Sequence, residues 1–298
     1  MKPVASWRRQ AKELIVGGRR FAYWTANERD EAKPWLLLIH GYPTSSWDWN
    51  FVWDDLAAHF RLAAIDMLGF GLSDKPKDVA YSIIDQADLQ EALLEHLGAG
   101  EAHLLAHDYG DTVAQELLAR QEEKSLSFSI RSIVFLNGGL FPEQHRARPI
   151  QKLGLTPIGF LIGLMMTRRR LRKTFDEIFG KETRASDAEI DAHWELIREN
   201  GGAQILHKLL QYIPERRRNR ERWVGALQST RTPMRLIDGG ADPVSGEHLF
   251  RHYQALVPAA DAKLLDGIGH YPQTEAPGEV VRLFLEFHSA NRTIAQKA

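Results

Sequence analysis

The sequence contains no cysteine. This absence excludes disulfides, thiolate metal sites and a cysteine nucleophile. Long apolar runs are also missing. The longest, from Leu153 to Met166, has only 14 residues, with Thr, Pro and Gly among them, which is too short to cross a bilayer as a helix. The first residues carry charges and lack the apolar stretch of a signal peptide, so we expect a cytoplasmic protein.

A strong charge of either sign is missing as well. The 298 residues include 38 Lys and Arg against 39 Asp and Glu, so we expect no general attraction to nucleic acid. Residues 140–225 nevertheless hold 17 basic and 11 acidic side chains, a net charge of +6, which leaves −7 for the remainder. We interpret the basic clusters Arg168–Lys173 and Arg216–Arg220 as solvated helix faces, with a membrane surface or an anion site as the alternative.

Short apolar, β-rich segments alternate with helical patterns along most of the chain. This alternation predicts an α/β fold with a mostly parallel sheet flanked by helices. The eight expected strands are Glu13–Val16, Phe21–Thr25, Trp35–His40, Arg61–Ile65, Glu101–Ala106, Arg131–Leu136, Met234–Asp238 and Lys263–Leu265. The expected helices between them are Ser46–His59, Ile83–Leu97, Asp111–Glu122, Ser245–Val257 and Gly278–His288.

Two features modify this simple pattern. Gly17-Gly18 between the first two strands predicts a hairpin, so the amino-terminal edge of the sheet should be antiparallel. Residues 140–225 show helical patterns and no convincing strand, which predicts an inserted helical cap. The expected organisation is a core formed by residues 1–139 and 226–298, with the cap between them.

A tight turn between a strand and a helix is predicted at Asp108. An apolar strand leads into it, and the small residues Ala106 and Gly110 stand two positions before and after it. This is the form of a nucleophile elbow, in which the turn exposes the nucleophile and the flanking positions must be small. Ala106 stands where Gly is usual, a change that leaves the turn possible. An Asp in this place is also compatible with simple helix capping, so its assignment depends on two further motifs.

The first of these motifs is His40-Gly-Tyr-Pro, directly after a strand of buried type. In enzymes with a nucleophile elbow, the loop in this position supplies one backbone N–H of an oxyanion hole, and the residue after the nucleophile supplies the other. We therefore assign the two donors to Tyr42 and Tyr109. We interpret His40 as a structural support of the loop.

The second motif is an acid followed by a histidine. Asp242 lies just past the strand at Met234, and His270 lies past the next strand. Nucleophile, acid and histidine in this order form a catalytic triad whose loops meet at the carboxyl edge of one sheet. Asp238 is a rival for the acid, but it stands on the strand end itself. Another position where such enzymes carry the acid is occupied here by Asn137.

With these motifs the chain resembles the α/β-hydrolase superfamily throughout, and within it the Asp-nucleophile branch of epoxide hydrolases and haloalkane dehalogenases. A closer resemblance is to the mesoderm-specific transcript family of hydrolases. The stretches that carry it are His40-Gly-Tyr-Pro-Thr-Ser-Ser, Asp66-Met-Leu-Gly-Phe-Gly-Leu-Ser-Asp-Lys-Pro, His107-Asp-Tyr-Gly-Asp-Thr-Val-Ala-Gln-Glu-Leu-Leu, Asn137-Gly-Gly-Leu-Phe-Pro-Glu, Leu210-Gln-Tyr-Ile and Arg222-Trp-Val-Gly-Ala-Leu.

The resemblance implies hydrolysis of a small hydrophobic substrate in two steps. Asp108 would displace a leaving group from a saturated carbon and form an alkyl ester. Water activated by His270 would then attack that ester, with Asp242 orienting the imidazole. This chemistry requires no cofactor and no metal.

The leaving group distinguishes the two candidate activities, epoxide hydrolysis and haloalkane dehalogenation. Related epoxide hydrolases donate to the ring oxygen from cap tyrosines, and Tyr212 stands at about the position of the second one, while no first one is evident. Trp194 or His193 is a substitute donor. Haloalkane dehalogenases commonly bind the halide with a Trp after the nucleophile, where this chain has Tyr109, and with a second donor where it has Tyr42. We therefore favour an epoxide, and expect Tyr42, Tyr109, Trp194 and Tyr212 to contact it.

Other readings remain open from sequence. Tyr212 is alternatively a lid-packing residue. A non-catalytic member would bind a ligand in the same pocket, or a membrane or partner with the basic cap. An ester or carbon–carbon hydrolase is a third class, disfavoured by an Asp at the elbow. We expect the segment Leu153–Met166 to line an apolar pocket or to pack the lid on the core, and Met165-Met166 to fill gaps in that core.

Overall fold

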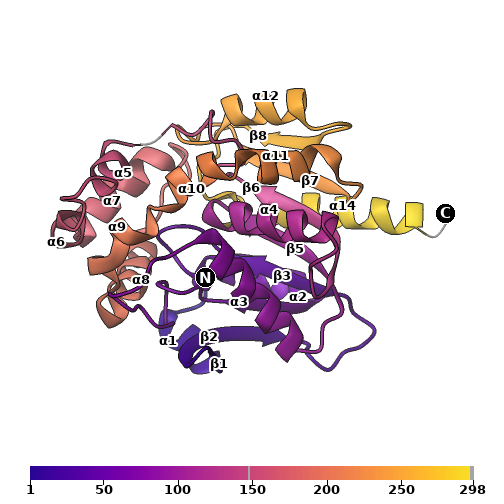
Figure 1. Cartoon of the computed structure of the whole chain (residues 1–298), viewed down its shortest axis with the longest axis horizontal. Coiled ribbons are helices and arrows are strands. Elements are labelled where there is room, and N and C mark those ends of the chain that lie inside the picture. The colour runs from indigo at the N-terminus through magenta and orange to yellow at the C-terminus, as the bar shows by residue number, and fades with distance from the viewer. Residues whose placement is uncertain (147, 296–298) are drawn as a thin grey trace.

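An eight-stranded sheet forms the centre of the molecule in the computed structural model, which describes residues 1–146 and 148–295 (Figure 1). Its strands are β1 (Lys12–Val16), β2 (Arg19–Ala26), β3 (Trp35–Ile39), β4 (Arg61–Ile65), β5 (Glu101–His107), β6 (Ser129–Leu136), β7 (Met234–Gly239) and β8 (Asp261–Leu265). They lie in the order β1-β2-β4-β3-β5-β6-β7-β8, and all neighbours from β4 to β8 are parallel. The predicted eight-stranded, mostly parallel sheet is therefore confirmed.

The amino-terminal edge is the antiparallel part of the sheet. Strand β1 pairs antiparallel with β2, and β2 pairs antiparallel with β4. Gly17 and Gly18 form the turn between β1 and β2 with φ values of 57° and 75°, a region that glycine enters without steric cost. The hairpin predicted from this pair is confirmed.

The central strands are apolar on both faces because both faces are covered. In β3, Leu36 and Leu38 belong to one hydrophobic cluster, while Leu37 and Ile39 belong to the other, and all four are fully buried. Side chains alternate between the two faces of a strand, so an uninterrupted apolar run is what a doubly covered parallel strand requires.

Helices cover both faces of the sheet. On one side lie α3 (Ile83–His96), α4 (Tyr109–Glu122) and α12 (Glu247–Leu256). On the other side lie α1 (Val4–Gln10), the 3-10 helix η1 (Ser46–Phe51), α2 (Trp53–Ala57) and α14 (Pro277–Ala295). The expected helix over residues 46–59 is thus two short helices. The sequence pattern did not predict α1, which is held by Trp7 stacked on Trp24 at 5.0 Å between ring centroids.

Helices alone fill the long connection between β6 and β7 in its described residues. They are α5 (Pro149–Gly154), α6 (Leu161–Met165), α7 (Arg168–Ile178), α8 (Asp187–Arg198), η2 (Glu199–Ile205), α9 (Leu206–Leu209), α10 (Tyr212–Arg218) and α11 (Arg220–Ser229). Helices α5 to α9 gather at the left of Figure 1, beside the sheet, while α11 packs on α4. In the described part of the chain, no helix has the length and apolar character needed to cross a membrane.

Candidate active site

The turn between β5 and α4 holds Asp108 in a strained conformation. Its φ is 49° and its ψ is −105°, in a region that side chains rarely occupy. The turn is tight because neighbouring chain segments touch it. A Cβ on Gly110 would lie 2.3 Å from the backbone oxygen of Ile39, and a Cβ on Gly41 would lie 2.9 Å from the Cβ of Asp108. These two glycines allow the loop after β3 to approach the predicted nucleophile closely.

The two carboxylate oxygens of Asp108 have different neighbours. The backbone N–H of Tyr42 donates to Oδ2 at 2.9 Å, while Oδ1 lies 3.9 Å from Nε2 of His270. His40 supports this loop, since its Nε2 accepts a hydrogen bond from the backbone N–H of Met67 at 3.1 Å. One carboxylate oxygen is thus held by the loop, and the other faces the histidine.

Asp242 holds the opposite side of the imidazole. Its Oδ2 lies 2.7 Å from Nδ1 of His270. The same oxygen accepts hydrogen bonds from the Ser245 hydroxyl at 2.7 Å and from Nδ2 of Asn137 at 3.2 Å, and Oδ1 accepts from the backbone N–H of Val244 at 2.8 Å. These donors stabilise the charged form of the Asp242 carboxylate, and the carboxylate in turn holds the His270 ring in one orientation.

Burial and charge act in opposite directions on this pair. Burial alone would raise the pKa of Asp242, but the charge and hydrogen bond of His270 outweigh it and lower the pKa to about 2. Burial alone would lower the pKa of His270, but the charge and hydrogen bond of Asp242, with a contribution from the Asp108 charge, raise it to about 9. Near neutral pH the resting histidine therefore carries a proton between two carboxylates.

Asp238, the rival for the acid, takes a different position. Asp238 lies on strand β7 within the sheet and is fully buried. Burial and the nearby Asp242 charge raise its pKa well above the usual range. The structure records no contact between Asp238 and His270 among its hydrogen bonds and ion pairs for the described residues. The geometry therefore brings Asp242 to the histidine, as the loop argument expected.

Tyr212 belongs to a buried aromatic group behind the loop. Its ring centroid lies 6.2 Å from that of Tyr42 and 5.1 Å from that of Tyr109. Its hydroxyl lies 3.4 Å from Nε2 of Gln151, at the upper limit for a hydrogen bond. Beneath it, the guanidinium of Arg216 lies 4.4 Å from the ring centroid. The cap helix α10 thus brings a tyrosine to the nucleophile turn, although its side chain is not in the cavity wall.

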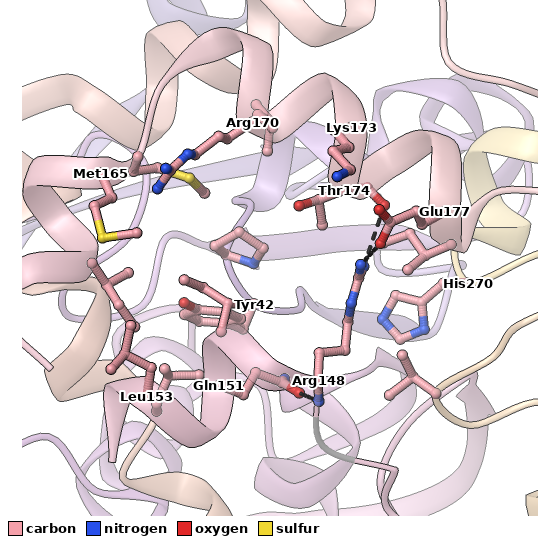
Figure 2. A pocket seen from close by; sticks show the side chains of 18 of the residues that line it. Tyr42, Arg148, Gln151, Leu153, Met165, Arg170, Lys173, Thr174, Glu177 and His270 are labelled. Carbon is pink, nitrogen blue, oxygen red and sulfur yellow. Dashed lines mark hydrogen bonds and ion pairs between the residues drawn. The ribbon is translucent and has the colours of Figure 1, made fainter. Parts of the chain in front are cut away.

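A cavity of about 530 Å³ borders two of the predicted catalytic groups, and Figure 2 shows His270 at its side. Asp108 and His270 form part of its wall, and most of the remainder is apolar. The apolar side chains in the wall are Tyr42, Pro43, Ile150, Leu153, Ile162, Met165, Met166, Leu171, Ile178, Leu210 and Val244. Volume and lining are those of a site for a small, largely apolar molecule.

Residues of the cap segment that we expected to line a pocket do so. Leu153, Ile162, Met165 and Met166 all face the cavity. Met165 and Met166 were expected to fill gaps in the core, but both are partly exposed in the cavity wall, and Met166 also packs against the main hydrophobic cluster. Unbranched thioether side chains adapt their shape to a bound molecule as well as to a core.

Polar residues of the cavity were missed by the sequence analysis. Arg148 and Glu177 form an ion pair beside His270, and Arg170 and Lys173 line the same wall (Figure 2). The sequence analysis interpreted the cluster Arg168–Lys173, which contains Arg170 and Lys173, as a solvated helix face. The one usable signal was the spacing of residues 170, 173 and 177, which puts them on one face of a helix.

Of the four predicted substrate contacts, Tyr42 lines this cavity, while Tyr109, Trp194 and Tyr212 do not. Trp194 on α8 is partly buried against the main hydrophobic cluster, and His193 is buried 3.7 Å from Asp48. Neither contributes to the cavity wall. Within residues 1–146 and 148–295, no group of three or more His, Asp and Glu side chains is arranged to hold a metal ion.

Known proteins resemble this chain in sequence and in fold. The model of the "Alpha/beta hydrolase family" matches residues 36–283. The "Mesoderm-specific transcript homolog protein" of Bos taurus is 40% identical over 292 residues, which cover 95% of this chain and 87% of that protein. The haloalkane dehalogenase DbeA-M1 loop variant from Bradyrhizobium elkanii superposes with a TM-score of 0.78 at 21% identity, covering 96% and 98% of the two chains. Epoxide hydrolase CorEH superposes with a TM-score of 0.77 at 20% identity, covering 94% and 98%.

Proposed function

Because this chain belongs to the alpha/beta hydrolase family, together with the mesoderm-specific transcript homologs, we propose that it hydrolyses a small hydrophobic epoxide through a covalent ester at Asp108. The observation that carries the proposal is the asymmetry of the Asp108 carboxylate. Oδ2 accepts the Tyr42 N–H, so Oδ1 is left to attack a carbon in the cavity. A carboxylate in place of Ser suits attack at a saturated carbon, since the product is an ester that water can cleave.

In the first step, Oδ1 forms a bond to an epoxide carbon and the ring C–O bond breaks. The electron pair goes to the ring oxygen, which becomes an alkoxide and takes a proton from a donor. Tyr212 is our candidate for that donor, because its ring lies beside Tyr42 and its hydroxyl lies 3.4 Å from Nε2 of Gln151, and both of these neighbours line the cavity. Burial and the Asp108 charge raise the pKa of Tyr212, so its hydroxyl is protonated in the resting enzyme.

The second step needs a neutral histidine, and the first step helps to create one. Esterification removes the Asp108 charge, which is one of the interactions that raise the pKa of His270. The imidazole then loses its proton more readily and becomes a base for water. The proton that His270 gives up returns the Tyr212 phenolate to its phenol form. Water then attacks the Asp108 carboxyl carbon while His270 takes one of its protons, and the backbone N–H groups of Tyr42 and Tyr109 stabilise the oxyanion. Collapse of this intermediate breaks the bond to the substrate oxygen, which takes the second proton of the attacking water, so the diol leaves and the Asp108 carboxylate is restored. Asp242 holds the ring and stabilises its protonated form throughout.

The His270→Gln variant tests the proposal directly. It should form the ester and fail to hydrolyse it, because the general base is missing while the nucleophile is intact. After incubation with a panel of aliphatic and aryl epoxides, intact-protein mass should rise by the mass of one substrate, and peptide mapping should place the adduct on Asp108.

A matched variant controls for non-specific alkylation. His59→Gln makes the same change at an exposed surface position and should accumulate no adduct. A folded His270→Gln protein that stays unmodified across the epoxide panel would contradict epoxide hydrolysis and would favour a ligand-binding role for the cavity.

Tyr212→Phe tests the leaving group. Removing the proton donor should lower the rate of epoxide opening by roughly 10²-fold. Single-turnover kinetics would measure this rate, with Tyr253→Phe as the control, since Tyr253 is equally buried but lies on α12 away from the cavity. Equal rates in Tyr212→Phe and the parent protein would make Tyr212 a packing residue and remove our assignment of the donor. Turnover of haloalkanes with no turnover of epoxides would replace the substrate class.

A further inference from the structure

One face of the cap helix α7 forms a wall of the cavity. Lys173, Thr174 and Glu177 stand three, four and seven positions after Arg170, so the four residues share a face, and all line the cavity. Figure 2 shows Arg170, Lys173 and Thr174 along this wall, above the space that His270 and Met165 bound on opposite sides.

The basic residues of α7 fall into two groups. Arg168 and Arg172, which do not line the cavity, form ion pairs with Asp187 on the neighbouring helix α8, and Arg168 also pairs with Asp191. The ion pairs of these two arginines therefore link α7 to α8.

The cations that line the cavity differ from Arg168 and Arg172 in their ion-pair partners. Arg148 is neutralised by Glu177 through an ion pair across the cavity. No ion pair of Arg170 or Lys173 is present among the described residues, so the wall carries two uncompensated positive charges. Both residues are exposed, so their charged groups stay hydrated in the absence of a ligand.

Apolar side chains share this cavity with the two cations and the nucleophile Asp108. Ile162, Met166, Leu171 and Leu210 contribute to the wall, while the Arg148–Glu177 ion pair lies beside His270. A neutral epoxide would use the apolar part and leave the cations without function. A molecule with an apolar chain and an anionic end would satisfy both parts.

We propose that Arg170 and Lys173 form an anion subsite, and that the cavity accepts an amphiphile whose carboxylate or phosphate monoester binds there while its apolar chain extends toward Asp108. The placement of the reactive carbon at Asp108 rests on the proposed function, whereas the subsite does not. Arg170 offers a planar fork that matches a carboxylate or phosphate, and Lys173 adds a second point charge. The substrate of this site is then an anionic epoxide rather than a neutral one.

Binding of unreactive amphiphiles tests the subsite without any chemistry at Asp108. We would titrate the protein with decanoate, decyl phosphate and the neutral decanol in a calorimeter. An exposed ion pair contributes up to about fivefold in affinity, so two cations should favour an anion over decanol by roughly tenfold. This preference should shrink as salt is raised from low to physiological strength. The anion that binds more tightly identifies the head group as carboxylate or phosphate.

Variants on one helix locate the subsite. Arg170→Gln and Lys173→Gln should each reduce anion affinity by about threefold to fivefold and leave decanol unchanged. Arg169→Gln is the matched control, because this exposed neighbour makes the same change of charge but does not line the cavity. It should bind all three amphiphiles as the parent does.

Two outcomes would overturn the subsite. One is equal affinity for decanoate, decyl phosphate and decanol. The other is an equal loss in Arg169→Gln and Arg170→Gln, because a basic surface that attracts any anion, including an anionic vesicle, would explain it. The mass experiment on His270→Gln is independent, so an anion preference without an Asp108 adduct would retain the subsite and reject the epoxide.

Discussion

Asp108→Asn should lower kcat by at least about 10⁴-fold, because it removes the atom that forms the covalent bond. The turn itself should survive, since Asn tolerates a positive φ better than most residues and the φ at this position is 49°. Steady-state turnover of an epoxide that alkylates His270→Gln would measure the loss. Asp108→Ala, which has no side-chain nucleophile, provides a second variant.

A nearby buried aspartate serves as the control for this prediction. Asp111 lies on α4, fully buried, and burial with the Asp108 charge raises its pKa well above the usual range. Burial therefore favours its neutral form, and Asn is a neutral side chain of the same shape. We expect its activity to stay within about tenfold of the parent. Substantial turnover in a folded Asp108→Ala protein would exclude Asp108 as the nucleophile.

The second large effect is expected for Asp242→Asn, with a decrease in kcat of about 10³ to 10⁴-fold. The amide cannot stabilise the protonated imidazole, and it favours the wrong tautomer of His270. Loss of the Asp242 charge should also lower the pKa of His270 from about 9, because that charge contributes to raising it. The pH profile of ester hydrolysis, followed in single turnovers, would measure both changes.

Asp238→Asn is the matched control for the acid. Burial favours the neutral form of Asp238, and no hydrogen bond or ion pair joins it to the histidine in the described chain, so the change should cost less than about tenfold in kcat. If Asp238→Asn were the more damaging of the two, the assignment of Asp242 would be wrong. Asn137 permits a rescue, since its Nδ2 lies 3.2 Å from Oδ2 of Asp242. A carboxylate introduced by Asn137→Asp in the Asp242→Asn background should restore roughly tenfold of the lost activity.

Several parts of the fold could be predicted because their signals are local. The run Leu36–Ile39 indicates a strand covered on both faces, and Gly17-Gly18 indicates the hairpin. The helix α1 gave no such signal. It is seven residues long, and it is held by the contact of Trp7 with Trp24, a packing interaction between segments that sequence patterns do not report.

The sequence by itself determined the eight strands and most helices of the core, and it identified Asp108, Asp242 and His270 as a set. Each of them follows a strand, and parallel strands bring their carboxyl ends to one edge, so chain order and element type were sufficient. The 2.7 Å contact between Asp242 and His270 then required only that these loops meet.

Only the tertiary structure decided what the cap does. Whether Arg170 and Lys173 face solvent or a cavity depends on the side of α7 that packs against the rest of the protein. The ion pair between Arg148 and Glu177 likewise depends on how α5 and α7 cross. An amphipathic pattern fixes which residues share a helix face, but the packing of helices far apart in the chain fixes what that face meets.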